Sequence, residues 1–144
     1  MPRPAPWRLS PDAYLHTAAV QTRFQDLDVL GHLNNVAFAA LFETGRTKFN
    51  HQARLWGALR HRRSVVARME INYLAEGHFP DDVEIATGIG AIGNRSWEIL
   101  SLMRQNGVAL ATCDVTIVMD KDEAGNGLPE PFKAELAKWL VREG

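Results

Sequence analysis

The chain has one cysteine, Cys113, and no long run of apolar residues. A single cysteine excludes a disulfide within the chain and fits a reducing compartment. Because Cys113 lies in an alternating apolar stretch, we expect a buried and unreactive thiol. No window approaches the roughly 18 apolar residues that a membrane-spanning helix needs, and the N-terminal segment lacks the apolar core of a secretory signal. These absences favour a cytoplasmic protein with no membrane partner.

Neither sign of charge dominates, since 16 basic and 17 acidic residues leave a net charge of −1. Nucleic acids and anionic membrane surfaces are bound through a basic excess, so neither is an expected partner. The five histidines show no ligand spacing such as His-x₃-His, so no metal site is predicted. What is present is an ordinary globular composition, 46% hydrophobic and 23% charged, which predicts a folded, core-forming chain.

A chain of 144 residues is long enough for one domain with a substantial core. Three prolines among the first six residues predict an extended lead-in over residues 1–16. The remaining residues, 17–144, are expected to form a single domain.

Alternating apolar residues predict strands, and the longest stretch of helical spacing predicts one central helix. This helix begins after Asn34, a favourable N-cap, and continues to about residue 55, where Gly57 is expected to end it. Its apolar side is formed by Phe38, Leu41, Phe42, Gly45 and Phe49. Strands are predicted over 17–25, 65–74, 83–91, 96–104 and 108–119, and a short amphipathic helix over 131–142.

This order of elements predicts an α+β fold. A long central helix would lie against a curved antiparallel sheet of about five strands, followed by a short C-terminal helix. One helix leaves the edges of such a sheet unpaired, which predicts dimerisation through a sheet edge.

The loop that precedes the long helix carries the strongest chemical signal. Asp28, Gly31 and His32 stand within a few residues of Asn35, where the helix begins. A helix N-terminus offers unpaired N–H groups and a partial positive charge, so it can hold the oxygen of a carbonyl that a nearby carboxylate attacks. Asp28 would act as a nucleophile or as a general base, and the sequence leaves both open. The alternative is a turn aspartate that accepts hydrogen bonds from nearby backbone N–H groups.

Two side chains near Asp28 are weaker candidates for a chemical role. His32 would orient Asp28, donate a hydrogen bond to a substrate, or cap the loop. Asp26 is expected to be structural and to pair with Arg23, three residues earlier.

A family resemblance rests on the run Arg23-Phe24-x-Asp26-x-Asp28-x-x-Gly31-His32-x-Asn34-Asn35, followed by Phe42-Glu43-x-x-Arg46. This run resembles the signature of hotdog-fold acyl-CoA thioesterases, and the 4-hydroxybenzoyl-CoA thioesterase family is the most similar group. The resemblance continues through residues 67–74 and covers roughly residues 18–120. It implies a hotdog fold, in which a curved sheet wraps a long helix, assembled as a homodimer or homotetramer. It also implies hydrolysis of an acyl-CoA, with no cofactor other than the coenzyme A that the substrate carries.

The resemblance implies roles for single residues. In related enzymes the aspartate of the Asp-x-x-Gly run performs the chemistry, and here it is Asp28. A backbone N–H at the start of the long helix polarises the thioester carbonyl, and the matching position is Asn35, with His32 as a third catalytic candidate.

The substrate is expected to extend away from these residues. The coenzyme A arm usually runs along a subunit interface, where Arg95, Ser96 and Arg62 are candidates for binding its phosphates, with solvated loop arginines as the alternative. The acyl group is expected to contact Phe38, Phe42, Met69 and Tyr73.

Two other functions stay open. One is a hotdog protein that binds an acyl-CoA or an acyl-carrier protein without hydrolysis. The other is a hotdog hydratase, which is disfavoured because Asp28 and His32 are four residues apart and the Asn-Pro of the hydratase pattern is missing.

Overall fold

The computed structural model describes residues 3–143, so residues 1, 2 and 144, at the outer limits of the predicted lead-in and domain, lie outside the described part. The described part contains β1 (His16–Val20), α1 (Asn35–Gln52), α2 (Trp56–His61), β2 (Ser64–Tyr73), β3 (Val83–Ile92), β4 (Ser96–Gln105), β5 (Val108–Met119) and α3 (Glu130–Ala137). The predicted α+β fold, with a five-stranded antiparallel sheet, a long helix and a short C-terminal helix, is confirmed.

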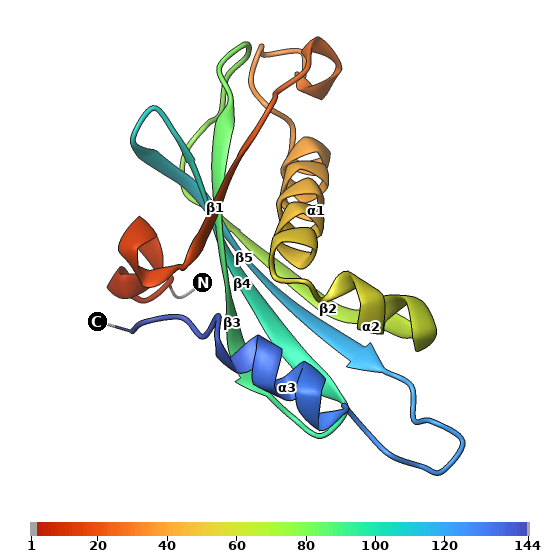
Figure 1. Cartoon of the computed structure of the whole chain (residues 1–144). Helices are drawn as coiled ribbons and strands as arrows, with labels where there is room; N and C mark the ends of the chain where they lie inside the picture. Colours follow the sequence, from red (N-terminus) through yellow and green to blue (C-terminus); the bar gives the residue numbers. More distant parts are fainter. Residues whose placement is uncertain (1–2, 144) are drawn as a thin grey trace.

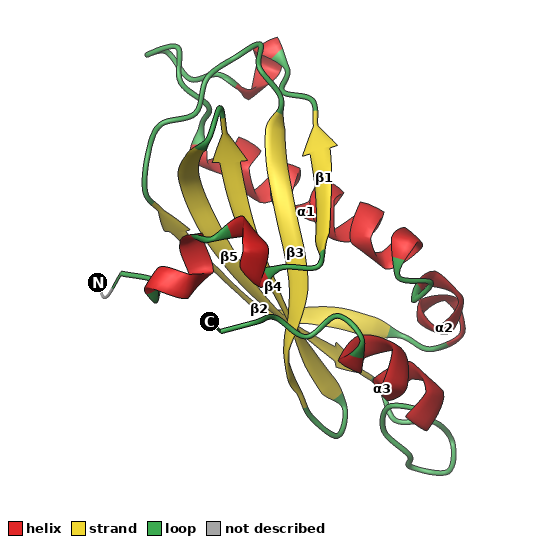
Figure 2. Ribbon diagram, turned by 60° about the vertical axis from the view of Figure 1, so that its left-hand side comes forward, coloured by secondary structure: helices red, strands yellow, loops and turns green. Residues whose placement is uncertain are grey.

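The five strands form one antiparallel sheet in the order β1-β3-β4-β5-β2, so β1 and β2 are its edges. Figure 1 shows α1 against one face of this strongly twisted sheet. In Figure 2, turned by 60°, the same helix lies behind the strands. The molecule therefore has a helical layer on one face of a curved sheet.

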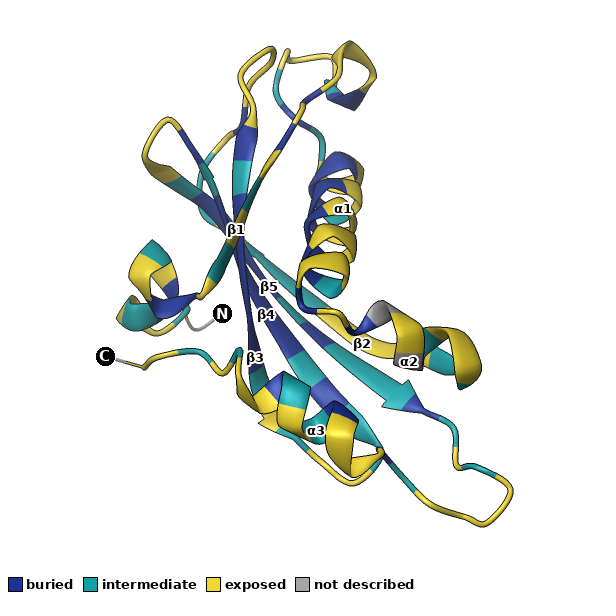
Figure 3. Ribbon diagram, in the orientation of Figure 1, coloured by how far each residue is buried: buried dark blue, intermediate teal, exposed yellow. Residues whose placement is uncertain are grey.

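The buried side of α1 is the side that its sequence makes apolar. Phe42 and Phe49 have no exposed surface, and Gly45 is buried between them. A Cβ atom on Gly45 would come within 2.5 Å of Cγ2 of Ile85 in β3. Because glycine has no Cβ, helix and sheet can approach this closely. Figure 3 shows the buried side of α1 turned toward the sheet.

The helix α1 ends earlier than predicted, and Gly57 does not end it. Arg54 has a φ of 59°, the left-handed conformation that glycine usually adopts after a helix. The N–H of Arg54 donates to the carbonyl of His51 at 3.2 Å, and the N–H of Leu55 donates to the carbonyl of Asn50 at 2.9 Å. These bonds satisfy the last carbonyls of α1, and the chain then begins α2, which contains Gly57.

The first strand is shorter than predicted. It stops at Val20 instead of residue 25, because Phe24–Asp26 form a 3₁₀ turn. The hydroxyl of Thr22 donates to the carbonyl of Asp81 at 2.9 Å, which holds the chain beside the loop that precedes β3.

The predicted extended lead-in over residues 1–16 is wrong for its described part. Pro6–Leu9 and Pro11–Ala13 are 3₁₀ turns, which Figure 2 shows in front of the strands, opposite α1. Arg8 is buried there, with Nη1 2.7 Å from Oδ1 of Asp114 in β5 and Nε donating to the hydroxyl of Tyr14 at 2.9 Å. Pro6 and Pro11 each begin one of these turns, a position that suits proline, and the ion pair of Arg8 holds the segment against the sheet.

The C-terminal helix also ends before its predicted limit of residue 142. After Ala137 the chain runs along β3, where the N–H of Ile89 donates to the carbonyl of Trp139 at 2.8 Å. The N–H of Val141 donates in turn to the carbonyl of Ile89 at 2.9 Å. Pairing with the strand replaces the last helical turn.

A Gly45→Ala substitution tests the close contact between α1 and β3. Alanine improves helix propensity by about 1 kcal/mol, but an extra methyl in a packed core costs about 1–3 kcal/mol. Because the clash is with the branched Cβ region of Ile85, we expect a cost in the upper part of this range and a net loss of about 1–2 kcal/mol in the free energy of unfolding, measured by urea denaturation. The matched control is Gly57→Ala, where no atom lies within 4 Å of the added Cβ. Equal stability of the two variants would contradict this packing.

The thiol of Cys113 provides a second test of the core. It lies on β5 opposite Ile71 and is buried, and burial raises its pKa to about 11. At pH 8 only on the order of one thiol in a thousand is then the reactive thiolate. We expect the native chain to resist iodoacetamide at pH 8 and the urea-unfolded chain to be alkylated readily, as followed by mass spectrometry. Rapid labelling of the native chain would refute the buried position.

Candidate active site

The chain between β1 and α1 closes into a short loop. The N–H of Asp28 donates to the carbonyl of His32 at 2.8 Å, and Leu27 and Leu33 form a β-bridge. At the tip, Gly31 has a φ of 81°, which glycine adopts without strain, and its N–H donates to the carbonyl of Asp28 at 3.1 Å. The backbone itself therefore fixes the loop, with Gly31 at its bend.

Asp28 lies on the exposed side of this loop. Its Oδ1 accepts hydrogen bonds from the N–H of Leu30 at 2.9 Å and the N–H of His32 at 3.2 Å. These are the bonds of a turn aspartate, and they orient the carboxylate. Within residues 3–143, no donor contacts Oδ2 of Asp28. One carboxylate oxygen holds the loop, and the other is available for chemistry.

The start of α1 has two free amides. Asn34 is the N-cap, as predicted, and its Oδ1 accepts a hydrogen bond from the N–H of Ala37 at 2.7 Å. The N–H of Phe38 donates to the carbonyl of Asn34 at 3.2 Å. In the described part of the chain no acceptor contacts the N–H groups of Asn35 and Val36. These two groups sit at the positive end of the helix dipole, which favours an oxygen that carries negative charge.

Asp26 is structural, as predicted. It is 3% exposed, and its Oδ1 accepts hydrogen bonds from Nη2 and Nε of Arg23 at 2.8 and 3.2 Å. Its carbonyl also accepts the N–H of Asn34 at 2.8 Å. Asp26 therefore connects the turn after β1 to the first residue before α1.

His32 contributes to the loop through both its backbone and its ring. Its backbone N–H holds Asp28, as described above, whereas its Nε2 lies 3.2 Å from Oε2 of Glu76. Its ring packs edge-on against His78 with 5.5 Å between centroids, and the N–H of Leu33 donates to the carbonyl of Gly77 at 2.9 Å. The segment after β2 thus supports the loop of Asp28, and the sequence analysis had not singled out Glu76.

Tyr73 makes a contact that the sequence did not reveal. Its hydroxyl donates to the carbonyl of Asn35 at 3.2 Å, and its ring packs edge-on against Phe38 with 5.2 Å between centroids. The hydroxyl is protonated at neutral pH, as the ordinary pKa of tyrosine requires, and partial burial raises the pKa of Tyr73. No local sequence signal marks this pair, because 38 residues separate Tyr73 from Asn35.

The predicted coenzyme A-binding residues lie together, but far from Asp28. Arg62 donates to the carbonyls of Asp120, Asn126 and Gly127. Arg95 donates through Nε to the carbonyl of Met119 at 3.2 Å, and Ser96 begins β4 beside it. Figure 1 places α2 directly after the C-terminal end of α1 and the turn between β3 and β4 beyond it, beside α3, whereas the loop of Asp28 precedes the N-terminal end of α1. Since α1 has 18 residues, about 27 Å separates the two ends.

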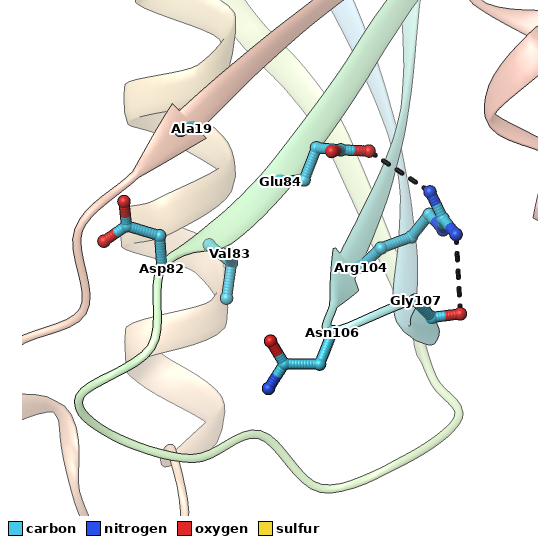
Figure 4. A pocket seen from close by; sticks show the side chains of 7 residues that line it. All are labelled: Ala19, Asp82, Val83, Glu84, Arg104, Asn106 and Gly107. Atoms are coloured by element: carbon cyan, nitrogen blue, oxygen red, sulfur yellow. Dashed lines mark hydrogen bonds and ion pairs between the residues drawn. The ribbon is translucent and has the colours of Figure 1, made fainter.

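A hollow of about 250 Å³ lies where β1, β3 and β4 meet the loops beyond them (Figure 4). Two of its charged residues form an ion pair, with Nη1 of Arg104 3.2 Å from Oε1 of Glu84, and Nη2 of Arg104 donates to the carbonyl of Gly107 at 3.4 Å. None of the predicted site residues lines this hollow. Its arrangement is that of a surface ion pair between neighbouring strands.

Metal and membrane features give no further site. Across residues 3–143, no three His, Cys, Asp or Glu side chains are grouped so as to hold a metal ion. No helix within the described residues is both long and apolar enough to cross a membrane.

Comparison with known proteins gives the family. The sequence profile of the thioesterase-like superfamily matches residues 22–140, whereas the comparison with curated proteins found no significant match. A predicted thioesterase from Bacillus stearothermophilus is 28% identical, with a TM-score of 0.78, 89% of this chain and 98% of that chain covered. A thioesterase from Thermus thermophilus, complexed with coenzyme A and Zn, is 29% identical, with a TM-score of 0.77, 88% of this chain and 95% of that chain covered.

The same comparisons identify the fold. A 1,4-dihydroxy-2-naphthoyl-CoA thioesterase from Synechocystis has a TM-score of 0.73 over 84% of this chain and 94% of that chain, and at 15% identity it supports the fold alone. The predicted hotdog fold is confirmed, while the narrower 4-hydroxybenzoyl-CoA thioesterase family stays a prediction. Because the superfamily profile spans most of its length, the chain belongs to the thioesterase-like superfamily and is a thioester hydrolase.

Proposed function

We propose that this chain is an acyl-CoA thioesterase, which hydrolyses its substrate to a free acid and coenzyme A at Asp28. The observation that carries the proposal is the free Oδ2 of Asp28 in a loop that leads directly into α1, whose N–H groups at Asn35 and Val36 have no acceptor among the described residues. Coenzyme A as the thiol component is supported by the Thermus thermophilus neighbour, which holds coenzyme A.

The proposed chemistry assigns one role each to the N–H of Asn35, the carboxylate of Asp28 and the N–H of His32. The thioester oxygen accepts a hydrogen bond from the N–H of Asn35, which stabilises the negative charge that develops on it. Asp28 either attacks the carbonyl carbon to give a mixed anhydride, which water hydrolyses, or removes a proton from the attacking water. In both routes the thiolate of coenzyme A leaves, and a thiolate needs no strong acid to help it leave. The backbone N–H of His32 holds Asp28 in place.

We further propose that two copies assemble through β2. This edge is ten residues long and exposes Val65, Val66, Met69 and Tyr73, and a long apolar edge is prone to pair with another strand. The other edge, β1, has only five residues, and Nζ of Lys48 donates to its Ala19 carbonyl at 2.9 Å. In such a dimer, Arg95, Ser96 and Arg62 of one copy would serve the Asp28 of the other, because α1 separates them within one chain.

A chain that bound acyl-CoA without hydrolysing it would contradict this proposal in one assay. A screen of short, long and aromatic acyl-CoAs with a thiol-reactive dye would give no thiol release, although calorimetry would detect binding. Thiol release that depends on Asp28 supports the thioesterase.

Substitution of Asp28 tests the chemistry directly. Asp28→Asn and Asp28→Ala should reduce kcat by roughly 10²–10⁴-fold, as expected for loss of a nucleophile or general acid–base group. Circular dichroism should show a folded chain in both variants. Asp12→Asn, an exposed carboxylate on the opposite side of the sheet, is the matched control and should keep wild-type turnover. Wild-type turnover in both Asp28 variants would disprove the proposed role.

The proposed assembly has its own test. Val66→Lys should convert the dimer into monomers, because a two-fold interface would bury an unpaired lysine charge at each of two symmetry-related positions. The matched control, Thr17→Lys, adds the same charge to the exposed face of β1 and should leave the dimer intact. Light scattering coupled to size-exclusion chromatography gives the molar mass of both variants. A Val66→Lys variant that is still a dimer would exclude β2 as the interface.

A further inference from the structure

Tyr73 joins the edge strand β2 to the first turn of α1. Its hydroxyl donates to the carbonyl of Asn35 at 3.2 Å, at the same helix end where two amides have no acceptor among the described residues. The ring is held separately by its edge-on contact with Phe38. The hydroxyl therefore makes a second contact, directed at the peptide backbone of the candidate site.

The carbonyl that Tyr73 contacts shares a peptide group with one of the two free amides. The carbonyl of Asn35 and the N–H of Val36 belong to the same planar unit. A hydrogen bond accepted by a carbonyl polarises the whole peptide group and makes its N–H a stronger donor. A carbonyl has two lone pairs, so it can accept from Tyr73 and still accept a bond within the helix.

In the described chain, no other amide of the first turn of α1 is both free and part of a peptide group whose carbonyl accepts a hydrogen bond from a side chain. The N–H groups of Ala37 and Phe38 donate to Oδ1 and the carbonyl of Asn34. The N–H of Asn35 belongs to the peptide group of the Asn34 carbonyl, which accepts from Phe38 within the helix. Among these amides, only that of Val36 is free in the described chain and also has its carbonyl partner bound by a side chain from the sheet.

We propose that Tyr73 is a positioning residue for thioester hydrolysis: its hydroxyl orients the peptide group between Asn35 and Val36, so that the N–H of Val36 joins that of Asn35 in holding the thioester oxygen. The inference rests on the proposed function and extends it to a second oxyanion donor. Tyr73 itself does not touch the reacting atoms. Its hydroxyl is a donor at neutral pH, because the ordinary pKa of tyrosine is about 10, and partial burial shifts the pKa of Tyr73 further upward.

Tyr73→Phe tests this role, because it removes the hydroxyl and keeps the ring against Phe38. Deleting a whole oxyanion donor costs about 10²–10³-fold in kcat; a donor that is weakened and less well oriented should cost about tenfold, with KM changed less than twofold. The matched control is Tyr14→Phe, the only other tyrosine in the sequence, whose hydroxyl contacts Arg8 on the opposite face of the sheet. It should keep wild-type kcat.

An NMR measurement that needs no substrate accompanies the kinetic assay. In ¹H–¹⁵N spectra, the amide proton of Val36 should move upfield in Tyr73→Phe, because its peptide group loses polarisation, and it should not move in Tyr14→Phe. An unchanged Val36 resonance together with unchanged kcat would overturn the inference. A higher KM with unchanged kcat would also overturn it, since that result means Tyr73 only binds the substrate.

These outcomes separate the two proposals. If Asp28→Asn is inactive and Tyr73→Phe turns over like the wild type, the inference fails and the proposed thioesterase stands. If the wild-type chain releases no thiol from any acyl-CoA, the thioesterase proposal fails and the role of Tyr73 in it fails too. The Val36 resonance then still reports whether the Tyr73 hydrogen bond exists.

Discussion

The contact between α1 and the sheet determines where everything else in this molecule lies. A helix is a stiff rod, so contacts that fix one point and the direction of its axis also fix the position of its ends. Gly45 provides that point, because its missing Cβ lets the helix backbone approach Ile85 of β3. Phe42 and Phe49, fully buried on either side, remove the remaining freedom of rotation. The free amides at the start of α1 are therefore presented at one defined place.

The loop of Asp28 is built on that fixed helix start. Backbone hydrogen bonds close the loop, the buried Asp26 connects it to Asn34, and the carbonyl of Gly77 anchors Leu33. Asp28 uses one oxygen to stabilise its own turn and keeps the other free. The turn role and the chemical role, which look like alternatives in the sequence, are therefore compatible in one side chain. A carboxylate held in this way needs little reorganisation when a substrate arrives.

The two faces of the sheet are covered by different elements, and its two edges differ in length and in exposed apolar side chains. One face packs against α1, and the N-terminal turns cover part of the other through Arg8 and its ion pair with Asp114. The edge at β1 is short and has Lys48 bonded to it, whereas β2 is long and exposes apolar side chains. Tyr73 is on this open edge and also contacts the start of α1. A partner strand on β2 would therefore lie next to the candidate site, which relates assembly to catalysis.

Much of this protein follows from local sequence. Alternation gives the strands, helical spacing gives α1, and the run from Arg23 to Asn35 contains the carboxylate, the glycine bend and the N-cap that the structure brings together. These features were predictable because each depends on residues within a few positions of one another. The Arg23–Asp26 pair belongs to the same class, since its partners are three residues apart.

Tertiary structure alone decided the features whose partners are distant in the chain. Arg8 pairs with Asp114 and holds the N-terminal turns against the sheet, the chain after α3 pairs with Ile89, and Tyr73 reaches Asn35 across 38 positions. The end of α1 also escaped prediction, because Arg54 occupies a conformation that its residue type does not favour. In each case a contact that the fold creates outweighs the local preference of the residues, and a preference of about 1 kcal/mol per residue is small enough to be outweighed in this way.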